Sequence, residues 1–176
     1  MRGDDAAVFQ SPGSAHGRLY QRAFRLTERP APERMGEMVR RRELDEGLER
    51  LTGLLVAMAE HVENALGGAM EALETLDAGT ARRIIEADPE LNRMEEQIAD
   101  TGVRIIATQQ PVAKDLRRIL AAFRMAADLE RMGDLSVDIA RTVLRLQGQT
   151  LIKPLADLPE MARIVRTMIR ESIRAY

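Results

Sequence analysis

Apolar side chains recur at alternating intervals of three and four residues over 44–76, a spacing that only a helix gathers on one face. The stripe continues for about five heptads, which is typical of a helix packed lengthwise against other helices. It predicts a helix over about 43–77, roughly 50 Å long at 1.5 Å per residue, with Gly79 as the following stop signal. Its members are Leu44, Leu48, Leu51, Leu55, Met58, Val62, Ala65, Ala69, Leu73 and Leu76.

Two further segments, 80–109 and 112–147, carry a stripe of the same period. Pro111 ends the first of them and Gly148 the second. Because the links between the three segments are short, neighbouring helices must run antiparallel. The sequence therefore predicts an all-α fold, an antiparallel three-helix bundle over 38–148. The two stripes read Ile84, Asp88, Leu91, Glu95, Ile98, Gly102, Ile105 and Leu116, Ile119, Phe123, Ala126, Glu130, Gly133, Val137, Ala140, Leu144.

The segments on either side of this bundle differ from it. Residues 1–36 hold four of the 12 glycines and three of the seven prolines without an apolar period, which predicts a disordered extension. Residues 149–176 predict a linker and a fourth amphipathic helix, which either packs on the first bundle or is the first helix of a second bundle that is cut off. A short helix with an apolar stripe is marginal alone, so we expect it to fold back on 43–147 or to pair with another copy. Its predicted stripe is Leu158, Met161, Val165, Met168 and Ser172, widened by Ile164, Ile169 and Ile173.

Composition excludes several classes of function. The chain has no cysteine and two histidines, which excludes disulfides and thiolate sites and nearly excludes histidine-rich metal sites and Ser-His-Asp triads. Aromatic residues at 3% and a net charge of -2 argue against a nucleic-acid surface. No run of 18 apolar residues is present, so no membrane span is predicted. We expect a soluble, cytoplasmic protein.

Acidic residues occupy positions that the apolar period assigns to the interior. These residues are Asp88, Glu95 and Glu130. Burying an ionised carboxylate without a partner costs several kcal/mol or more, so three buried acids in one bundle need an explanation. Glu130 and Asp134 are also i,i+4 neighbours on one helix face, with Cβ atoms about 6 Å apart. An all-oxygen set of ligands suits hard cations such as iron, manganese or magnesium. The candidate metal ligands are Asp88, Asn92, Glu95, Glu130, Asp134 and Asp138.

Each acid also has an explanation without a metal. Asp88 precedes Pro89, so it is also the pattern of an N-cap after a break in the second helix. Glu95 is equally compatible with a solvated position. Glu130 and Asp134 are in range of ion pairs with nearby arginines. The arginines in question are Arg124, Arg131 and Arg141.

Two motifs resemble the PhoU family of phosphate-uptake regulators. Residues 110–119 read QPVAKDLRRI and residues 128–140 read DLERMGDLSVDIA, which is similar to the family pattern of QPVA-DLR followed by LERIGD. The row of Asp88, Asn92 and Glu95 also resembles the family's D-x-x-x-N-x-x-E row. One departure is Asp138, where the family usually has asparagine.

The resemblance implies two tandem three-helix bundles, of which this chain holds the first and one helix of the second. It also implies multinuclear metal sites at E/D-x-x-x-D motifs, which correspond here to Glu130 and Asp134. The implied function is an accessory protein of phosphate-specific transport that negatively regulates phosphate uptake and the phosphate-starvation response. Its implied partners are the sensor histidine kinase and the ATPase subunit of the phosphate ABC transporter, with no nucleic acid. We expect a homodimer that meets the membrane only through these partners.

Two other functions are weaker candidates. A carboxylate-bridged metalloenzyme of the ferritin type needs Glu-x-x-His pairs, and neither His16 nor His61 follows a glutamate by three positions on the predicted helices. We therefore expect no enzyme. The remaining alternative is a truncated structural or dimerisation module of helices without regulatory activity.

Overall fold

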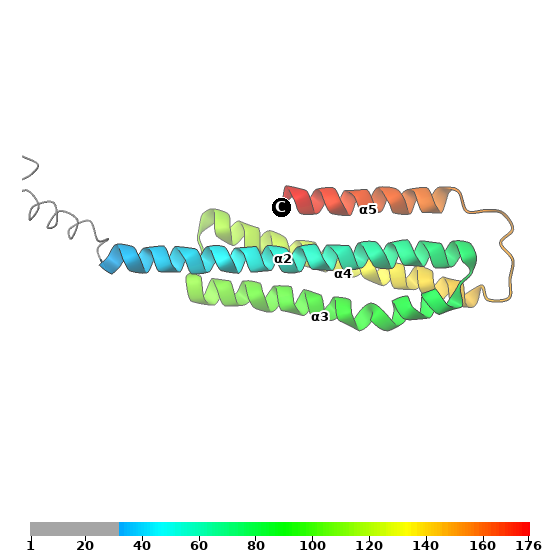
Figure 1. Ribbon diagram of the computed structural model, residues 1–176, viewed down its shortest axis with the longest axis horizontal. Helices are drawn as coiled ribbons and strands as arrows, with labels where there is room; N and C mark the ends of the chain where they lie inside the picture. Colours follow the sequence, from blue (N-terminus) through cyan, green and yellow to red (C-terminus); the bar gives the residue numbers. More distant parts are fainter. Residues whose placement is uncertain (1–31) are drawn as a thin grey trace, which may run out of the picture. The chain divides into compact units, whose positions relative to one another are not determined.

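The computed structural model describes residues 32–176, and these form four helices with no strand among them. The helices are α2 (Pro32–Thr75), α3 (Ala78–Gln109), α4 (Ala113–Arg145) and α5 (Asp157–Ala175). From residue 43 onward, α2, α3 and α4 lie side by side in alternating directions (Figure 1). The predicted all-α fold with an antiparallel three-helix bundle is confirmed.

The first helix begins earlier than its apolar stripe predicts. It starts at Pro32 rather than near 43, and the side chains of residues 35–43 are all exposed. This stretch is rich in glutamate, arginine and methionine, which have high helix propensity, and proline is favoured in the first turn. An apolar period reports burial and not helicity, so it missed a helical stretch whose side chains are exposed. The predicted extension 1–36 therefore contributes residues 32–36 to α2, and residues 1–31 lie outside the described part of the chain.

The predicted stripes form the core. Leu51, Leu55 and Met58 of α2 have no exposed surface, and burial of such a side chain contributes roughly 1.5–3 kcal/mol. Leu91 and Ile98 of α3 belong to the same core. The members of this main core cluster are Leu44, Leu48, Leu51, Leu55, Met58, Ala59, Val62, Leu91, Ile98, Ile105, Ile119, Ala122, Ala126, Leu129 and Ile169.

The connection between α2 and α3 differs from the predicted glycine stop. Helix α2 ends at Thr75, and Leu76, not Gly79, takes the left-handed conformation with a φ of 53°. Asp77 then caps α3, since its carboxylate accepts a hydrogen bond from the backbone N–H of Gly79 at 2.8 Å and another from the Thr80 hydroxyl at 2.6 Å. Gly79 thus lies in the first turn of α3, because the aspartate cap defines the helix start before the glycine.

Two glycines lie where side chains of α3 and α4 pack closely. A Cβ atom on Gly102 of α3 would lie 2.3 Å from the ring of Phe123, and one on Gly133 of α4 would lie 2.0 Å from Cδ2 of Leu91. Both distances are below any real contact, so a larger residue at either position would force the facing side chain or the helices to shift. This close packing brings the acidic positions of α3 and α4 near one another.

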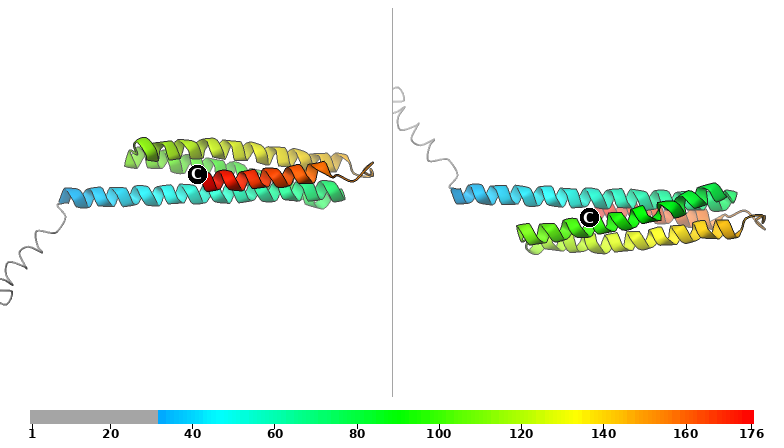
Figure 2. Two further views of the ribbon diagram at one scale, coloured as in Figure 1. Left: turned by 90° about the horizontal axis from the view of Figure 1, so that it is seen from above. Right: turned by 90° about the horizontal axis from the view of Figure 1, so that it is seen from below.

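Helix α5 folds back on the bundle, which was one of the two predicted outcomes. It lies between α2 and α4, as Figure 2 shows from two sides. The predicted stripe is confirmed only in part. Leu158, Met161 and Met168 are 43%, 59% and 61% exposed, whereas Val165, Ile169 and Ile173 of the predicted set pack on the bundle. The side of α5 that faces the bundle consists of Ala162, Val165, Ile169, Ile173 and Tyr176.

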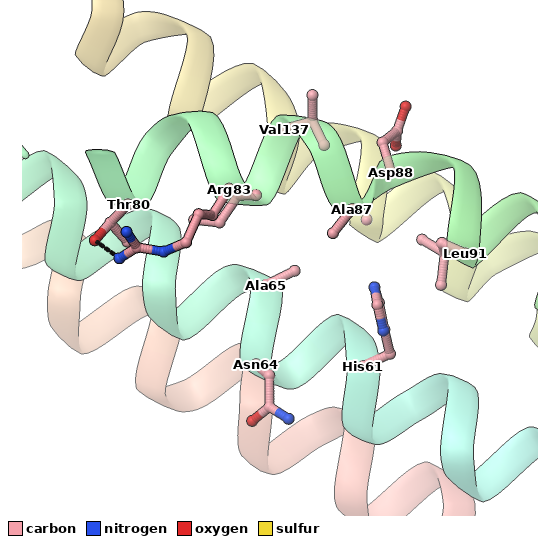
Figure 3. A pocket seen from close by; sticks show the side chains of 11 residues that line it. His61, Asn64, Ala65, Thr80, Arg83, Ala87, Asp88, Leu91 and Val137 are labelled. Atoms are coloured by element: carbon pink, nitrogen blue, oxygen red, sulfur yellow. Dashed lines mark hydrogen bonds between the residues drawn. The ribbon is translucent and has the colours of Figure 1, made fainter. Parts of the chain in front are cut away.

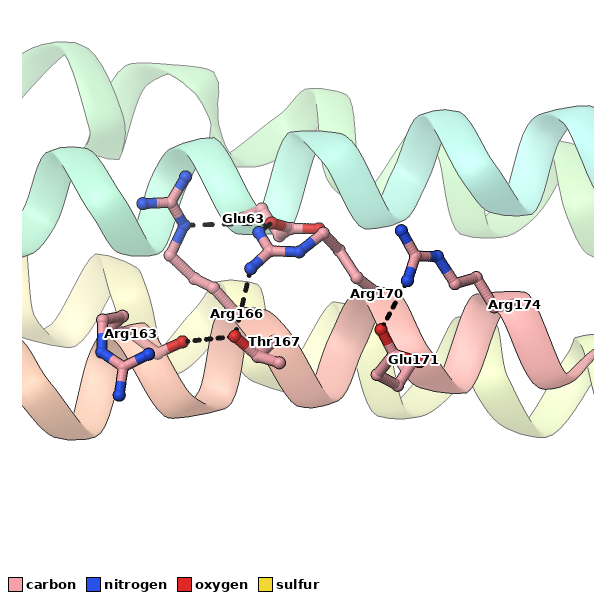
Figure 4. A network of polar contacts seen from close by, with 7 residues as sticks. All are labelled: Glu63, Arg163, Arg166, Thr167, Arg170, Glu171 and Arg174. Atoms are coloured by element: carbon pink, nitrogen blue, oxygen red, sulfur yellow. Dashed lines mark hydrogen bonds and ion pairs between the residues drawn. The ribbon is translucent and has the colours of Figure 1, made fainter.

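An ion pair explains this rotation of α5. Glu63 of α2 is only 9% exposed, and it accepts a hydrogen bond from Arg170 at 2.5 Å, with Nε of Arg166 at 3.9 Å (Figure 4). A buried carboxylate needs such a partner, so Glu63 requires that α5 turn its arginines toward α2. The apolar residues of α5 cover an arc of the helix wide enough to present either of two faces to the bundle. Their period alone therefore did not predict which face packs.

None of the described helices combines the length and the apolar character needed to cross a bilayer.

Candidate metal site

The carboxylates predicted on the stripes gather along the seam between α3 and α4. Glu130 on α4 and Asp88 and Glu95 on α3 are half-buried, whereas Asp134 is exposed. Helices α3 and α4 pack against each other along this seam. The apolar period predicted that Asp88, Glu95 and Glu130 lie in the interior of the bundle. The structure places these three acids at the edge of that interior.

The pKa of Glu130 shows that these acids interact. Burial raises the pKa of this carboxyl above its ordinary value, and the negative charge of Asp134 raises it next. The charge of Glu95, a hydrogen bond with Asp134 and the charge of Asp88 raise it further. Four carboxyl groups from two helices therefore share one electrostatic environment in which the ionised form of Glu130 is disfavoured.

No cation compensates this group among the described residues. Neither Glu130 nor Asp134 has an ion pair within residues 32–176, and Arg141 pairs with Asp138 at 2.9 Å instead. The alternative of an arginine lattice around Glu130 and Asp134 is therefore wrong in the described chain. Unpaired carboxylates that repel one another are a site that a cation would stabilise.

Asp88 has an unsatisfied carboxylate oxygen. Its Oδ1 is buried and has no hydrogen-bond partner, a condition that normally costs stability. The alternative of an N-cap at Asp88 is wrong, because α3 continues through Pro89 without a break. Proline inside a helix removes one backbone donor and favours a bend, and α3 bends in its N-terminal half (Figure 1). Asp88 is thus a helical residue with a free oxygen lone pair.

Two of the predicted ligands have other surroundings. Asn92 is exposed, and Asp138 is exposed with its carboxylate bound to Arg141. The described residues also contain no set of three or more acidic or histidine side chains already converged in the arrangement of a metal site. Asp88, Glu95, Glu130 and Asp134 therefore form an acidic cluster with oxygen donors of the right type for a hard cation, and their carboxylates do not converge on one point.

A cavity of about 230 Å³ lies beside this cluster, between α2, α3 and α4. Its walls include His61, Asp88, Leu91 and Gly133. Figure 3 shows the imidazole of His61 directed from α2 toward α3, while the carboxylate of Asp88 points away from it. His61 is half-buried, and it does not join the acids.

Sequence reasoning missed the ion pair of the buried Glu63 with Arg170. Glu63 directly follows the stripe residue Val62, so its position beside the stripe was the available signal. The arginine that satisfies it lies far away in the chain, and no local pattern connects the two. This pair serves the docking of α5 and is not part of the acidic cluster.

The described residues thus define a helical-bundle protein with an acidic seam between α3 and α4. The model of the PhoU domain family matches residues 55–143. The phosphate-specific transport system accessory protein PhoU homolog of Clostridium acetobutylicum is 37% identical over 77% of this chain and 63% of its own length. PhoU of Escherichia coli, of the same description, is 35% identical over 73% of this chain and 54% of its own.

A solved structure shows the same fold. The phosphate transport system regulatory protein PhoU from Streptococcus pneumoniae superposes with a TM-score of 0.69 at 28% identity, covering 76% of this chain and 62% of that one. The chain belongs to the PhoU family. It spans between about half and two thirds of the length of these relatives.

Proposed function

We propose that this protein is an accessory protein of a phosphate-specific transport system and a negative regulator of phosphate uptake and of the phosphate-starvation response. It acts as a cytoplasmic adaptor, as a homodimer, between the ATPase subunit of the phosphate ABC transporter and the sensor histidine kinase. Membership of the PhoU family supports this function, and its relatives are named as accessory proteins rather than enzymes. The lack of a nucleophile–base pair in the acidic cluster agrees with a binding role.

The adaptor is further proposed to bind a hard metal ion through Glu130 and Asp134, with Asp88 and Glu95 from α3. The observation that carries this step is the raised pKa of Glu130 in a group of four carboxyls without a cation. The unpartnered Oδ1 of Asp88 supplies an oxygen with a free lone pair beside them. Oxygen donors alone suit iron, manganese or magnesium. A bound ion would supply the positive charge that holds α3 and α4 together at this seam.

Metal content tests the cluster directly. Elemental analysis and titration calorimetry with manganese, magnesium and anaerobic iron would compare the wild type with a Glu130→Gln/Asp134→Asn variant. The matched control is Glu71→Gln/Glu74→Gln, which removes the same charge from exposed positions of α2. We expect metal to be lost in the first variant and kept in the control. Equal metal content in all three proteins contradicts the proposal.

Regulation is tested in a bacterium that lacks its own PhoU gene. Expression of this chain should lower a reporter of the phosphate-starvation response in high phosphate, and the kinase and the transporter ATPase should co-purify with it. The alternative, a structural module of helices, predicts a stable dimer by light scattering with neither repression nor co-purification. That result would overturn the regulatory function and leave the metal proposal to its own test.

A further inference from the structure

Helix α4 carries cations on a side away from its acidic seam. Lys114, Arg117 and Arg118 lie in its first two turns and line a groove of about 670 Å³ between α4 and the C-terminal half of α5. Ala121, Met125 and Ala175 form its apolar floor. No acidic side chain of the described residues lines this groove. We call it the basic groove.

Within residues 32–176, Lys114, Arg117 and Arg118 of the basic groove belong to no ion pair, and the guanidinium of Arg118 lies over the ring of Tyr176. By contrast, the neighbouring arginines of α5 are paired, as Arg170 is with Glu63 and Arg174 with Glu171. The arrangement leaves three positive charges together on one wall.

The position of these cations disfavours a purely structural explanation. The N-terminus of a helix carries a partial positive charge, so a cation in the first turn opposes the helix dipole. Lys114 is in the first turn of α4, and Arg117 and Arg118 follow in the next. Three cations in this place contribute nothing to the capping of α4, which has no side-chain hydrogen bond at its N-cap Val112.

Tyr176 gives the groove a defined wall. Its hydroxyl donates a hydrogen bond to the backbone carbonyl of Arg118 at 3.1 Å, and the guanidinium of Arg118 lies 5.7 Å from its ring. Burial raises the pKa of this phenol above its ordinary value, so the hydroxyl stays protonated at neutral pH. This contact joins the end of α5 to α4, and Lys114 and Arg117 beside it are exposed.

We propose that the basic groove binds an acidic segment of a partner protein that also carries an apolar side chain. The three unpaired cations supply charge complementarity for carboxylates, and the floor of alanine and methionine accepts an apolar anchor. The volume of the groove greatly exceeds that of a single small anion. Such an anion would contact the cations and leave the apolar floor exposed to water. The site lies apart from the acidic cluster and does not depend on the metal.

The test uses fluorescence anisotropy of the full chain with a fluorescein-labelled peptide of alternating glutamate and leucine. Affinity should fall with rising salt and should fall about tenfold in a Lys114→Gln/Arg117→Gln variant. The matched control is Arg124→Gln/Arg131→Gln, which removes two exposed charges from α4 outside the groove. Circular dichroism should show unchanged helicity in both variants, because all four side chains are exposed.

Three results would overturn the proposal. Equal losses in the two variants would mean that net charge alone attracts the peptide. Equal binding of a peptide with serine in place of leucine would mean that the apolar floor is not used. Complete displacement by inorganic phosphate at the peptide's own concentration would identify a site for small anions instead. Retained binding in the control, with weaker binding of the serine peptide, supports the acidic segment.

Discussion

Replacing Gly102 with alanine tests the close approach of α3 and α4. The new Cβ would lie 2.3 and 2.5 Å from two ring atoms of Phe123 and 3.0 Å from Cγ2 of Ile119. Ile119 is completely buried. The aromatic ring of Phe123 is rigid, so it can avoid the new atom only by moving as a whole. The ring must therefore move by about an ångström, or the helices must separate.

The expected change in stability follows from two opposing effects. Alanine is favoured over glycine within a helix by about 1 kcal/mol, and overpacking of a filled core costs typically about 1–3 kcal/mol. Since the obstacle is a rigid aromatic ring, we expect a cost near the upper end and a net loss of about 1–2 kcal/mol. For a chain of this size, that loss lowers the thermal midpoint by roughly 2–8 °C.

Gly53 provides the matched control. It lies on α2, it is exposed, and a Cβ there would meet nothing within 4 Å. Gly53→Ala should therefore raise stability by up to about 1 kcal/mol, the opposite sign to Gly102→Ala. Urea denaturation followed by circular dichroism measures both, and the smaller Phe123→Leu should recover part of the loss at Gly102. Equal effects of the two alanines, or no recovery with leucine, would refute the contact.

Three further predictions concern charge. Because the pKa of Glu130 is raised, the folded state is weakened as pH rises through that pKa, so Glu130→Gln should raise the thermal midpoint of the metal-free protein at pH 7 and change little at acid pH. The Thr80 hydroxyl and the Gly79 N–H lower the pKa of Asp77. Asp77→Ala should therefore lower the midpoint at pH 7, and this difference should shrink as pH falls below 3.8, the ordinary value. Arg170→Gln should speed chymotryptic cleavage within α5 more than Glu63→Gln does, because it strands a buried carboxylate; rates equal to that of the wild type in both variants would show that the pair does not hold α5.

The positions of the helices were largely predictable because helical periodicity is a local property. Leu51, Leu55 and Met58 were assigned to the core from their spacing, and all three are fully buried. Pro111 predicted the end of α3 because a proline lacks the backbone donor that a helix needs. The start of α2 was not predictable in this way, since residues 35–43 are exposed and their helicity depends only on propensity.

The sequence predicted which acidic residues are candidate ligands, but it predicted only some of their contacts with one another. The sequence by itself determined that Glu130 and Asp134 share a helix face, because their i,i+4 spacing is independent of any packing. Only the tertiary structure decided that Asp88 and Glu95 lie near Glu130, because that depends on how α3 and α4 pack against each other. The rotation of α5 was decided in the same way, since the requirement of the buried Glu63 for an arginine is a contact between segments distant in the chain.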